Sequence, residues 1–156
     1  MSEPLTPSVR EQIARAIHER YRRNQRDRKP ATDPAMKEWD ELAETLKHSN
    51  REQAADIGAK LRAIGCGVAP SRGAKPAVPF TAEELERLAI LEHDRWVAER
   101  SRAGWTLGPV KDVERKTTPY LVSWEELAEE IREYDREAVR AIPEVLAEAG
   151  LMMARG

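Results

Sequence analysis

Two stretches of this chain of 156 residues are variants of one sequence unit, and this repetition limits the possible folds more than any other feature. Residues 39–65 align without a gap with residues 124–150, so that Trp39 recurs 85 positions later as Trp124. Self-similarity at a fixed distance indicates that one supersecondary unit is used twice. The chain is therefore expected to fold as a pair of related units.

An earlier pair of stretches repeats at a shorter distance. Residues 5–25 align with residues 80–100 at a distance of 75 positions, and His18 recurs as His93. The second copy therefore has ten more residues between its two halves, in and around residues 104–120, GWTLGPVKDVERKTTPY. A loop of this length without regular structure is usually either functional or disordered.

Each copy is expected to form a helix, a connector, a short helix and a final helix. Val9, Ile13 and Ile17 are spaced by four residues and lie on one face of the first helix. In the second copy, Thr81 and Glu84 have the spacing of a capping box at the start of the corresponding helix.

The remaining helix boundaries follow from terminal signals. The final helices are expected to close at Gly65 and Gly150, and Pro143 is expected to kink the second of them. The expected helix starts are Asp33 and Ser123 for the short helices, and Ser49 or Asn50 and Asp135 for the final helices.

These patterns predict an all-α, mainly helical fold with short extended segments, including some in the loop at 104–122. Residues 1–66 form the first repeat, 67–79 a Gly- and Pro-rich linker, and 80–156 the second repeat. Each copy has too few apolar residues for a core of its own. We therefore expect the copies to pack together as one domain about a pseudo-two-fold axis.

Composition excludes several classes of protein. The net charge of −2 provides no general basic field, so nucleic-acid binding is a weaker option. The basic cluster from Arg20 to Lys29 is either a solvated helix end or faces a bound anion. The single cysteine fits a reducing cytoplasm. No apolar run is long enough to span a membrane, and the first residues lack an apolar stretch, so we expect neither a membrane span nor secretion by a signal peptide.

The sequence has no motif that indicates catalysis. It lacks metal-ligand spacings, phosphate-binding glycine loops and nucleophile motifs. We therefore expect no catalytic residue, no metal and no cofactor, and a protein that is not an enzyme. His18 and His93 leave two alternatives open: each holds a loop carbonyl through a hydrogen bond, or each contacts a ligand.

The second copy contains an ordered series of motifs. The series comprises Leu88 to Trp96, Gly104 to Asp112, Thr118 to Val122, Trp124 to Leu127, and Tyr134 to Arg136. It resembles the ryanodine-receptor repeat (RyR domain) family over about residues 83–150. The first copy resembles a degenerate repeat, because it lacks the G-W-x-x-G-P motif. The whole chain is thus similar to a tandem pair from a soluble bacterial or phage protein.

This resemblance implies a function. Paired repeats of the large calcium-release channels are similar to a nucleotide-binding module, with an adenine nucleotide in the cleft between the repeats, between their tryptophans and near arginines. It implies non-catalytic binding, as a sensor or by sequestration, of a nucleotide or nucleotide-derived molecule. Adenine nucleotides and ADP-ribose-like signals are the first candidates.

The expected site follows from the same resemblance. Tyr21 and Trp96 occupy the position of the first-helix tryptophan and could hold a base between them, which contributes roughly 1–3 kcal/mol. Arg100, one turn further on, and Lys111 could bind a phosphate. The expected ligand-binding residues are Tyr21, Asn24, Gln25, His93, Trp96, Arg100, Trp105, Lys111 and Tyr120.

Alternative interpretations remain open for this group. Trp39 and Trp124 are expected in the core, and Trp105 can equally be the anchor of its loop. The alternative function is a protein–protein interaction or scaffold module that docks a partner or copies of itself. An exposed apolar patch would favour this second interpretation.

Overall fold

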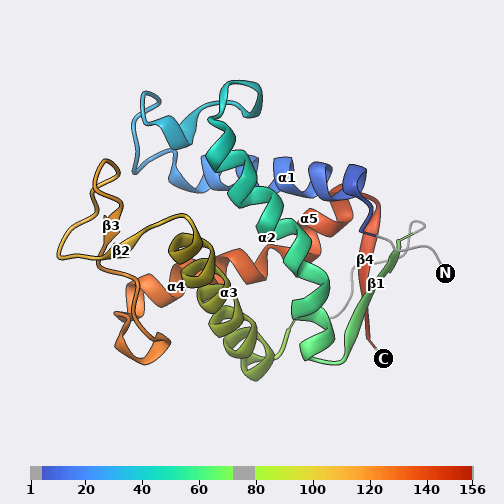
Figure 1. The fold of residues 1–156 in the computed structure, drawn as a ribbon. Helices are drawn as coiled ribbons and strands as arrows, with labels where there is room; N and C mark the ends of the chain where they lie inside the picture. The colour runs from blue at the N-terminus through green and yellow to red at the C-terminus, as the bar shows by residue number, and fades with distance from the viewer. Residues whose placement is uncertain (1–4, 72–79, 156) are drawn as a thin grey trace. The chain divides into compact units, whose positions relative to one another are not determined.

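The computed structural model describes residues 5–71 and 80–155 (Figure 1). These residues form five α-helices, three short 3-10 helices and four short β-strands. The predicted mainly helical fold with short extended segments is confirmed. The chain divides into two compact units, of which the first comprises Met1–Pro79 with Ala141–Gly156 and the second comprises Phe80–Arg140.

Two long helices dominate the first unit. α1 (Pro7–Gln25) and α2 (Glu44–Ala63) pack against each other, and the connection between them contains the 3-10 turns η1 (Pro34–Met36) and η2 (Trp39–Glu41). The short helix α5 (Ile142–Glu148), from the far end of the chain, packs against α1 (Figure 1).

A two-stranded antiparallel sheet completes the first unit. It joins β1 (Cys66–Pro70) to β4 (Leu151–Arg155), and Val68 lies opposite Met153. These two residues are 85 positions apart, which is the distance of the sequence repeat. Val68 and Met153 are thus equivalent residues of the two copies, and they pair at the middle of the sheet. Such a self-equivalent pairing is typical of a two-fold symmetric contact.

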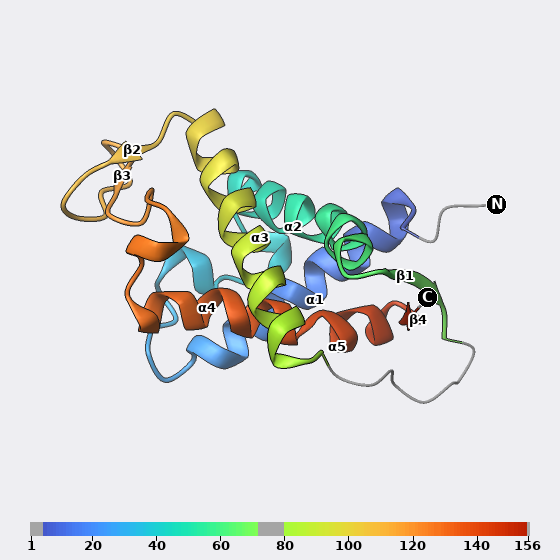
Figure 2. The same ribbon diagram turned by 90° about the horizontal axis from the view of Figure 1, so that it is seen from below.

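The second unit is built on α3 (Ala82–Arg102) and α4 (Glu129–Arg140), which pack against each other (Figure 2). The connection contains the parallel strands β2 (Thr106–Leu107) and β3 (Thr117–Thr118), followed by the 3-10 turn η3 (Trp124–Glu126). The strands confirm the short extended pieces predicted for the loop at 104–122.

The predicted capping box of α3 is present. The Thr81 backbone N–H donates to the Glu84 carboxylate at 2.9 Å, and the Glu84 N–H donates to the Thr81 hydroxyl at 3.1 Å. This reciprocal capping box fixes the start of α3. At the opposite ends of the repeats, Gly65 and Gly150 have φ values of 77° and 75°. Both adopt the left-handed conformation that closes a helix.

The predicted starts of the final helices are wrong. α2 begins at Glu44 rather than at Ser49 or Asn50, and α4 begins at Glu129 rather than at Asp135. The residue before α2, Ala43, makes no side-chain cap. Each helix instead continues almost directly from a 3-10 turn, and acidic residues in its first turn interact favourably with the helix dipole.

Pro143 does more than kink the final helix. α4 ends at Arg140, and α5 begins at Ile142 with the proline in its first turn. Proline has no N–H to donate and its ring clashes with the preceding turn, which explains the interruption. α5 and β4, which the sequence places in the second repeat, pack in the first compact unit.

The predicted linker also has structure at its start. Residues 67–70 belong to β1, and residues 72–79 lie outside the described residues. The first unit therefore extends into the range that the composition assigns to a linker.

Both units repeat the same histidine contact. His18 donates from Nε2 to the Lys37 carbonyl at 2.6 Å, and His93 donates to the Val122 carbonyl at 2.7 Å. The accepting carbonyls are 85 positions apart, as the repeat requires. Both histidines are buried, with 3% of their surface exposed. Each therefore holds the loop that precedes its last 3-10 turn, which is the first of the two predicted alternatives.

The second unit has a small apolar core. Ala89, Trp124 and Leu127 are buried together. The partly buried residues packed against them are Ile90, Val122 and Ile131. Trp124 and its counterpart Trp39 are 7% and 6% exposed, which confirms that both are core residues.

Candidate functional site

The loop after α3 is attached to the end of that helix. Gly104 has φ 91°, and its N–H donates to the Ser101 carbonyl at 3.1 Å. The Trp105 N–H donates to the Arg100 carbonyl at 2.9 Å. A left-handed glycine after the last turn reverses the chain, so that the indole of Trp105 is returned to the side of Arg100.

One contact joins the two arms of the loop, and a second attaches the loop to α3. A Cβ at Gly108 would lie 2.8 Å from the Cβ of Thr117, so only glycine allows the arms to approach this closely. Lys116 adopts φ 55°, an uncommon value for a residue with a side chain. Its Nζ donates to the Ala103 carbonyl at 2.9 Å and so binds the loop to the carboxyl end of α3.

Arg100 lies between two indole rings. Its guanidinium carbon is 5.7 Å from the ring centre of Trp96 and 5.3 Å from that of Trp105. Both distances are within the range of a cation–π interaction. All three side chains are partly buried. We call these three residues the Trp–Arg stack.

His93 extends the Trp–Arg stack into the core. Its ring lies 6.1 Å from that of Trp96 at an interplanar angle of 20°, and 6.2 Å from that of Trp124. Its Nδ1 is 3.8 Å from the Asp135 carboxylate on α4. The predicted ligand residue His93 is thus buried beneath Trp96, where it supports the ring.

A buried ion cluster lies on α3 beside the stack, and the sequence analysis missed it. Arg95 donates to Glu92 at 3.0 and 2.9 Å and to Glu99 at 2.7 Å. Burial opposes the charge of Arg95, but its hydrogen bonds to both carboxylates raise its pKa above the ordinary value. The spacing Glu–x–x–Arg–x–x–x–Glu along one helix was the available signal.

The other predicted residues of the second unit lie in its loop. Lys111 is exposed and adjoins Asp112, which pairs with Thr117. Tyr120 is 38% exposed, and its N–H donates to the Thr118 hydroxyl at 3.3 Å. Both side chains are accessible to a molecule in solution.

Tyr21, Asn24 and Gln25 lie at the end of α1 in the first unit. Asn24 is exposed, and Gln25 is buried. The Lys29 ammonium lies 5.2 Å from the ring centre of Tyr21 and donates to its hydroxyl at 2.5 Å. Tyr21 therefore also has a cation over its ring. This cation, Lys29, lies beyond the end of α1, where helical spacing does not predict it. The predicted stacking of a base between Tyr21 and Trp96 stays a prediction.

Residues 5–71 and 80–155 also bear on metal binding and membrane insertion. Across these ranges, no group of three or more His, Cys, Asp or Glu side chains could hold a metal ion. None of the helices formed by the same residues is sufficiently long and apolar to cross a membrane.

The sequence was also compared with models of known protein families. Residues 79–155 match the family described as the RyR domain. The match covers α3, the loop that carries Trp105, and everything that follows to the end of β4. Each motif of the ryanodine-receptor repeat quoted above falls within it. Residues 79–155 of this chain belong to the RyR domain family.

Proposed function

We propose that the RyR domain of this protein binds a nucleotide or a nucleotide-derived small molecule at the Trp–Arg stack. The observation that supports this most strongly is the position of Arg100 between Trp96 and Trp105. Within the described part of the chain, its guanidinium has no ion pair. The positive charge is held in place by two rings without being neutralised by a carboxylate.

The chemistry of the Trp–Arg stack suits such a ligand. A guanidinium binds a phosphate through two parallel hydrogen bonds, and it retains its charge at all ordinary pH values. An indole face stacks on a base, which contributes roughly 1–3 kcal/mol. The stack offers both groups within one turn of α3 and the start of its loop. Adenine nucleotides and ADP-ribose-like signals combine these two features.

The surroundings of the stack favour binding over catalysis. Glu92 and Glu99, the buried carboxylates nearest to it along α3, are held by Arg95. A carboxylate whose oxygens accept hydrogen bonds from an arginine is poorly placed to exchange a proton with a bound molecule. We therefore propose a non-catalytic role, as a sensor of the ligand or by sequestering it in the cytoplasm.

We also propose that residues 5–65 are a second, diverged repeat of the same kind. The shared contacts support this: the histidine to the loop carbonyl, the buried tryptophan of the 3-10 turn, and the closing glycine all recur. Tyr21 occupies the position of Trp96 and likewise has a cation over its ring, although that cation, Lys29, comes from beyond the position that matches Arg100. The first unit thus retains an aromatic–cation pair even though it lacks the loop.

A thermal-shift screen tests the proposed function. The full chain is heated with a panel of adenine nucleotides and ADP-ribose, together with inorganic phosphate as a control for the anion alone. A binder of the native state raises the midpoint of unfolding as its concentration increases. Arg100→Gln should abolish the shift, whereas Arg87→Gln, on an exposed position of the same helix, should retain it. Equal shifts in the two variants would refute the site.

A specific observation also favours the alternative, a protein-interaction module. Four of the five exposed large hydrophobic side chains in the described ranges lie between residues 107 and 120. Exposed apolar clusters mark interaction sites more often than isolated apolar residues do. The two functions are compatible, because the apolar residues differ from those of the Trp–Arg stack.

A further inference from the structure

The loop after α3 exposes an unusual amount of apolar surface. Leu107, Val110, Val113 and Tyr120 are 59%, 65%, 67% and 38% exposed. We call these four residues the loop patch. Single exposed hydrophobic residues are normal on a protein surface, whereas a cluster within one short loop calls for an explanation. Ligand binding at the Trp–Arg stack does not supply one, since the loop patch is no part of the stack.

The backbone of the loop is held in one conformation. Asp112 and Thr117 exchange two backbone hydrogen bonds of 3.0 Å, and the Thr117 hydroxyl donates to the Val110 carbonyl at 3.1 Å. Lys116 attaches the loop to α3. A surface that is ordered before binding loses little conformational entropy when a partner docks.

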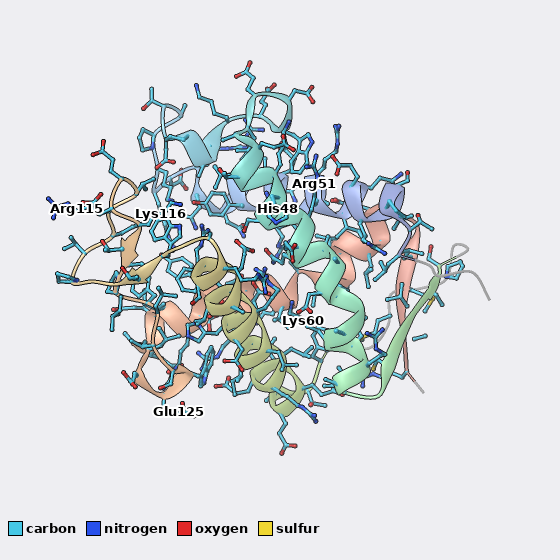
Figure 3. The ribbon with its side chains drawn as sticks, viewed as in Figure 1. His48, Arg51, Lys60, Arg115, Lys116 and Glu125 are labelled. Carbon is cyan, nitrogen blue, oxygen red and sulfur yellow. The ribbon has the colours of Figure 1, made fainter. Side chains whose placement is uncertain are left out.

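The loop has an excess of one positive charge near the loop patch, and Arg115 lies 3.8 Å from the Asp112 carboxylate. Lys111, Arg115 and Lys116 are exposed in the same loop, against the two acidic residues Asp112 and Glu114. The Arg115 side chain is 84% exposed and lies at the outer end of the loop (Figure 3). A partner that covers the loop patch should therefore have an acidic surface.

Such a surface exists in the same unit of this chain. Glu130, Tyr134 and Glu137 are exposed on α4, and their spacing of four and three residues places them on one helix face. Tyr134 is the fifth exposed large hydrophobic residue and is 51% exposed. We call these three residues the acidic patch. Glu137 also pairs with Arg140 at 2.9 Å, so the negative charge of this face comes mainly from Glu130. An aromatic residue beside this charge complements an apolar patch near basic residues.

We propose that two copies of this chain associate through their second units, with the loop patch of each copy against the acidic patch of the other. Two reciprocal contacts of this kind form a closed, two-fold symmetric pair. The apolar and aromatic side chains occupy the centre of each contact and the charges occupy its rim, as in known interfaces. The proposal does not depend on the proposed function, because neither patch includes the Trp–Arg stack.

Sedimentation velocity of the full chain without any nucleotide tests the association. The expected result is a concentration-dependent shift from the mass of one copy towards that of two. Val110→Asp combined with Val113→Asp should weaken the association at least tenfold, and Tyr134→Ala should weaken it as well. Circular dichroism should show unchanged folding, since all three side chains are exposed. A single-copy mass at every concentration would overturn the proposal.

Charge reversal provides a sharper test. Lys111→Glu with Arg115→Glu makes the loop acidic, and Glu130→Lys with Glu137→Lys makes the α4 surface basic. Each double variant alone should be a monomer, because like charges then face each other in both contacts. An equimolar mixture should associate, since one contact is then wild type and the other has both of its charges reversed.

A matched control separates patch chemistry from net charge. Arg23→Glu with Arg26→Glu makes the same change in charge at exposed positions of the first unit. This variant should associate as the wild type does. Failure of the mixture to associate, or equal loss in the control, would overturn the assignment of the patches.

Discussion

Arg136 of α4 and Glu86 of α3 form a bidentate ion pair, with hydrogen bonds of 2.9 and 3.0 Å. Arg51 of α2 and Glu11 of α1 form its counterpart, with hydrogen bonds of 2.7 and 3.0 Å. Both arginines also lie over the buried tryptophan of their own unit. The same three-residue arrangement thus joins the first and final helices of both units.

This arrangement predicts how stability changes with pH. The hydrogen bond from Arg136 lowers the pKa of Glu86 below its ordinary value of 4.5. Because the folded pKa is lowered, the pair stabilises the fold above pH 4.5, and this stabilisation is lost as the pH falls through the folded pKa. A partly exposed pair contributes about 0–1 kcal/mol.

Chemical denaturation of Arg136→Met and Glu86→Gln, alone and combined, measures this contribution as a double-mutant cycle. The coupling should be present at pH 7 and should shrink as the pH falls below 4.5. The cycle of Arg51 and Glu11 is the internal comparison, because Arg51 likewise lowers the pKa of Glu11. A coupling that grows towards acid pH would contradict the account.

His93 should stabilise the second unit through its loop. His93→Ala removes the buried donor of the Val122 carbonyl, and a carbonyl left without a partner costs about 1–3 kcal/mol, in addition to the lost packing. Urea unfolding should show this loss in the free energy of unfolding. The exposed His48 is the control, and His48→Ala should change stability little. Equal effects would show that the buried hydrogen bond has no special role.

Gly108→Ala should disturb the loop and not the helices. The added Cβ would lie 2.8 Å from the Cβ of Thr117, so the two arms must separate. Amide exchange in residues 106–118 should accelerate, and α3 should remain protected. Gly67→Ala is the matched control, because its Cβ would have no neighbour within 4 Å. Unchanged exchange in Gly108→Ala would mean that the arms are not tightly apposed.

Features with a local cause could be predicted from the sequence. The capping box at Thr81 and the closing glycines Gly65 and Gly150 are fixed by a few adjacent residues, and the structure has them in place. The histidine contact could be anticipated because His18 and His93 recur at the same position of each copy. Ser49 and Asp135 were predicted as helix starts from their residue type alone, and both lie inside helices. A single residue of this kind is therefore a weaker signal than a capping box.

Features that join distant parts of the chain were missed. The pairing of Val68 with Met153 unites the ends of both copies, and no local periodicity indicates which strand a short extended segment will join. The same holds for Lys29, which reaches back to Tyr21 from beyond the end of α1. In the candidate site, Trp96 was predicted from the resemblance to the ryanodine-receptor repeat, and Arg100 from its position one turn further along the same helix. The return of Trp105 to Arg100 depends on the turn at Gly104.

Binding of a nucleotide-type ligand at the Trp–Arg stack can be measured in solution. Isothermal titration calorimetry of the full chain with ATP, ADP and ADP-ribose tests it most directly, with Arg100→Gln and Arg87→Gln titrated in parallel. We expect saturable binding of at least one ligand by the wild type and by Arg87→Gln, and its loss in a folded Arg100→Gln. Absence of binding at millimolar ligand, or undiminished binding by Arg100→Gln, would contradict it.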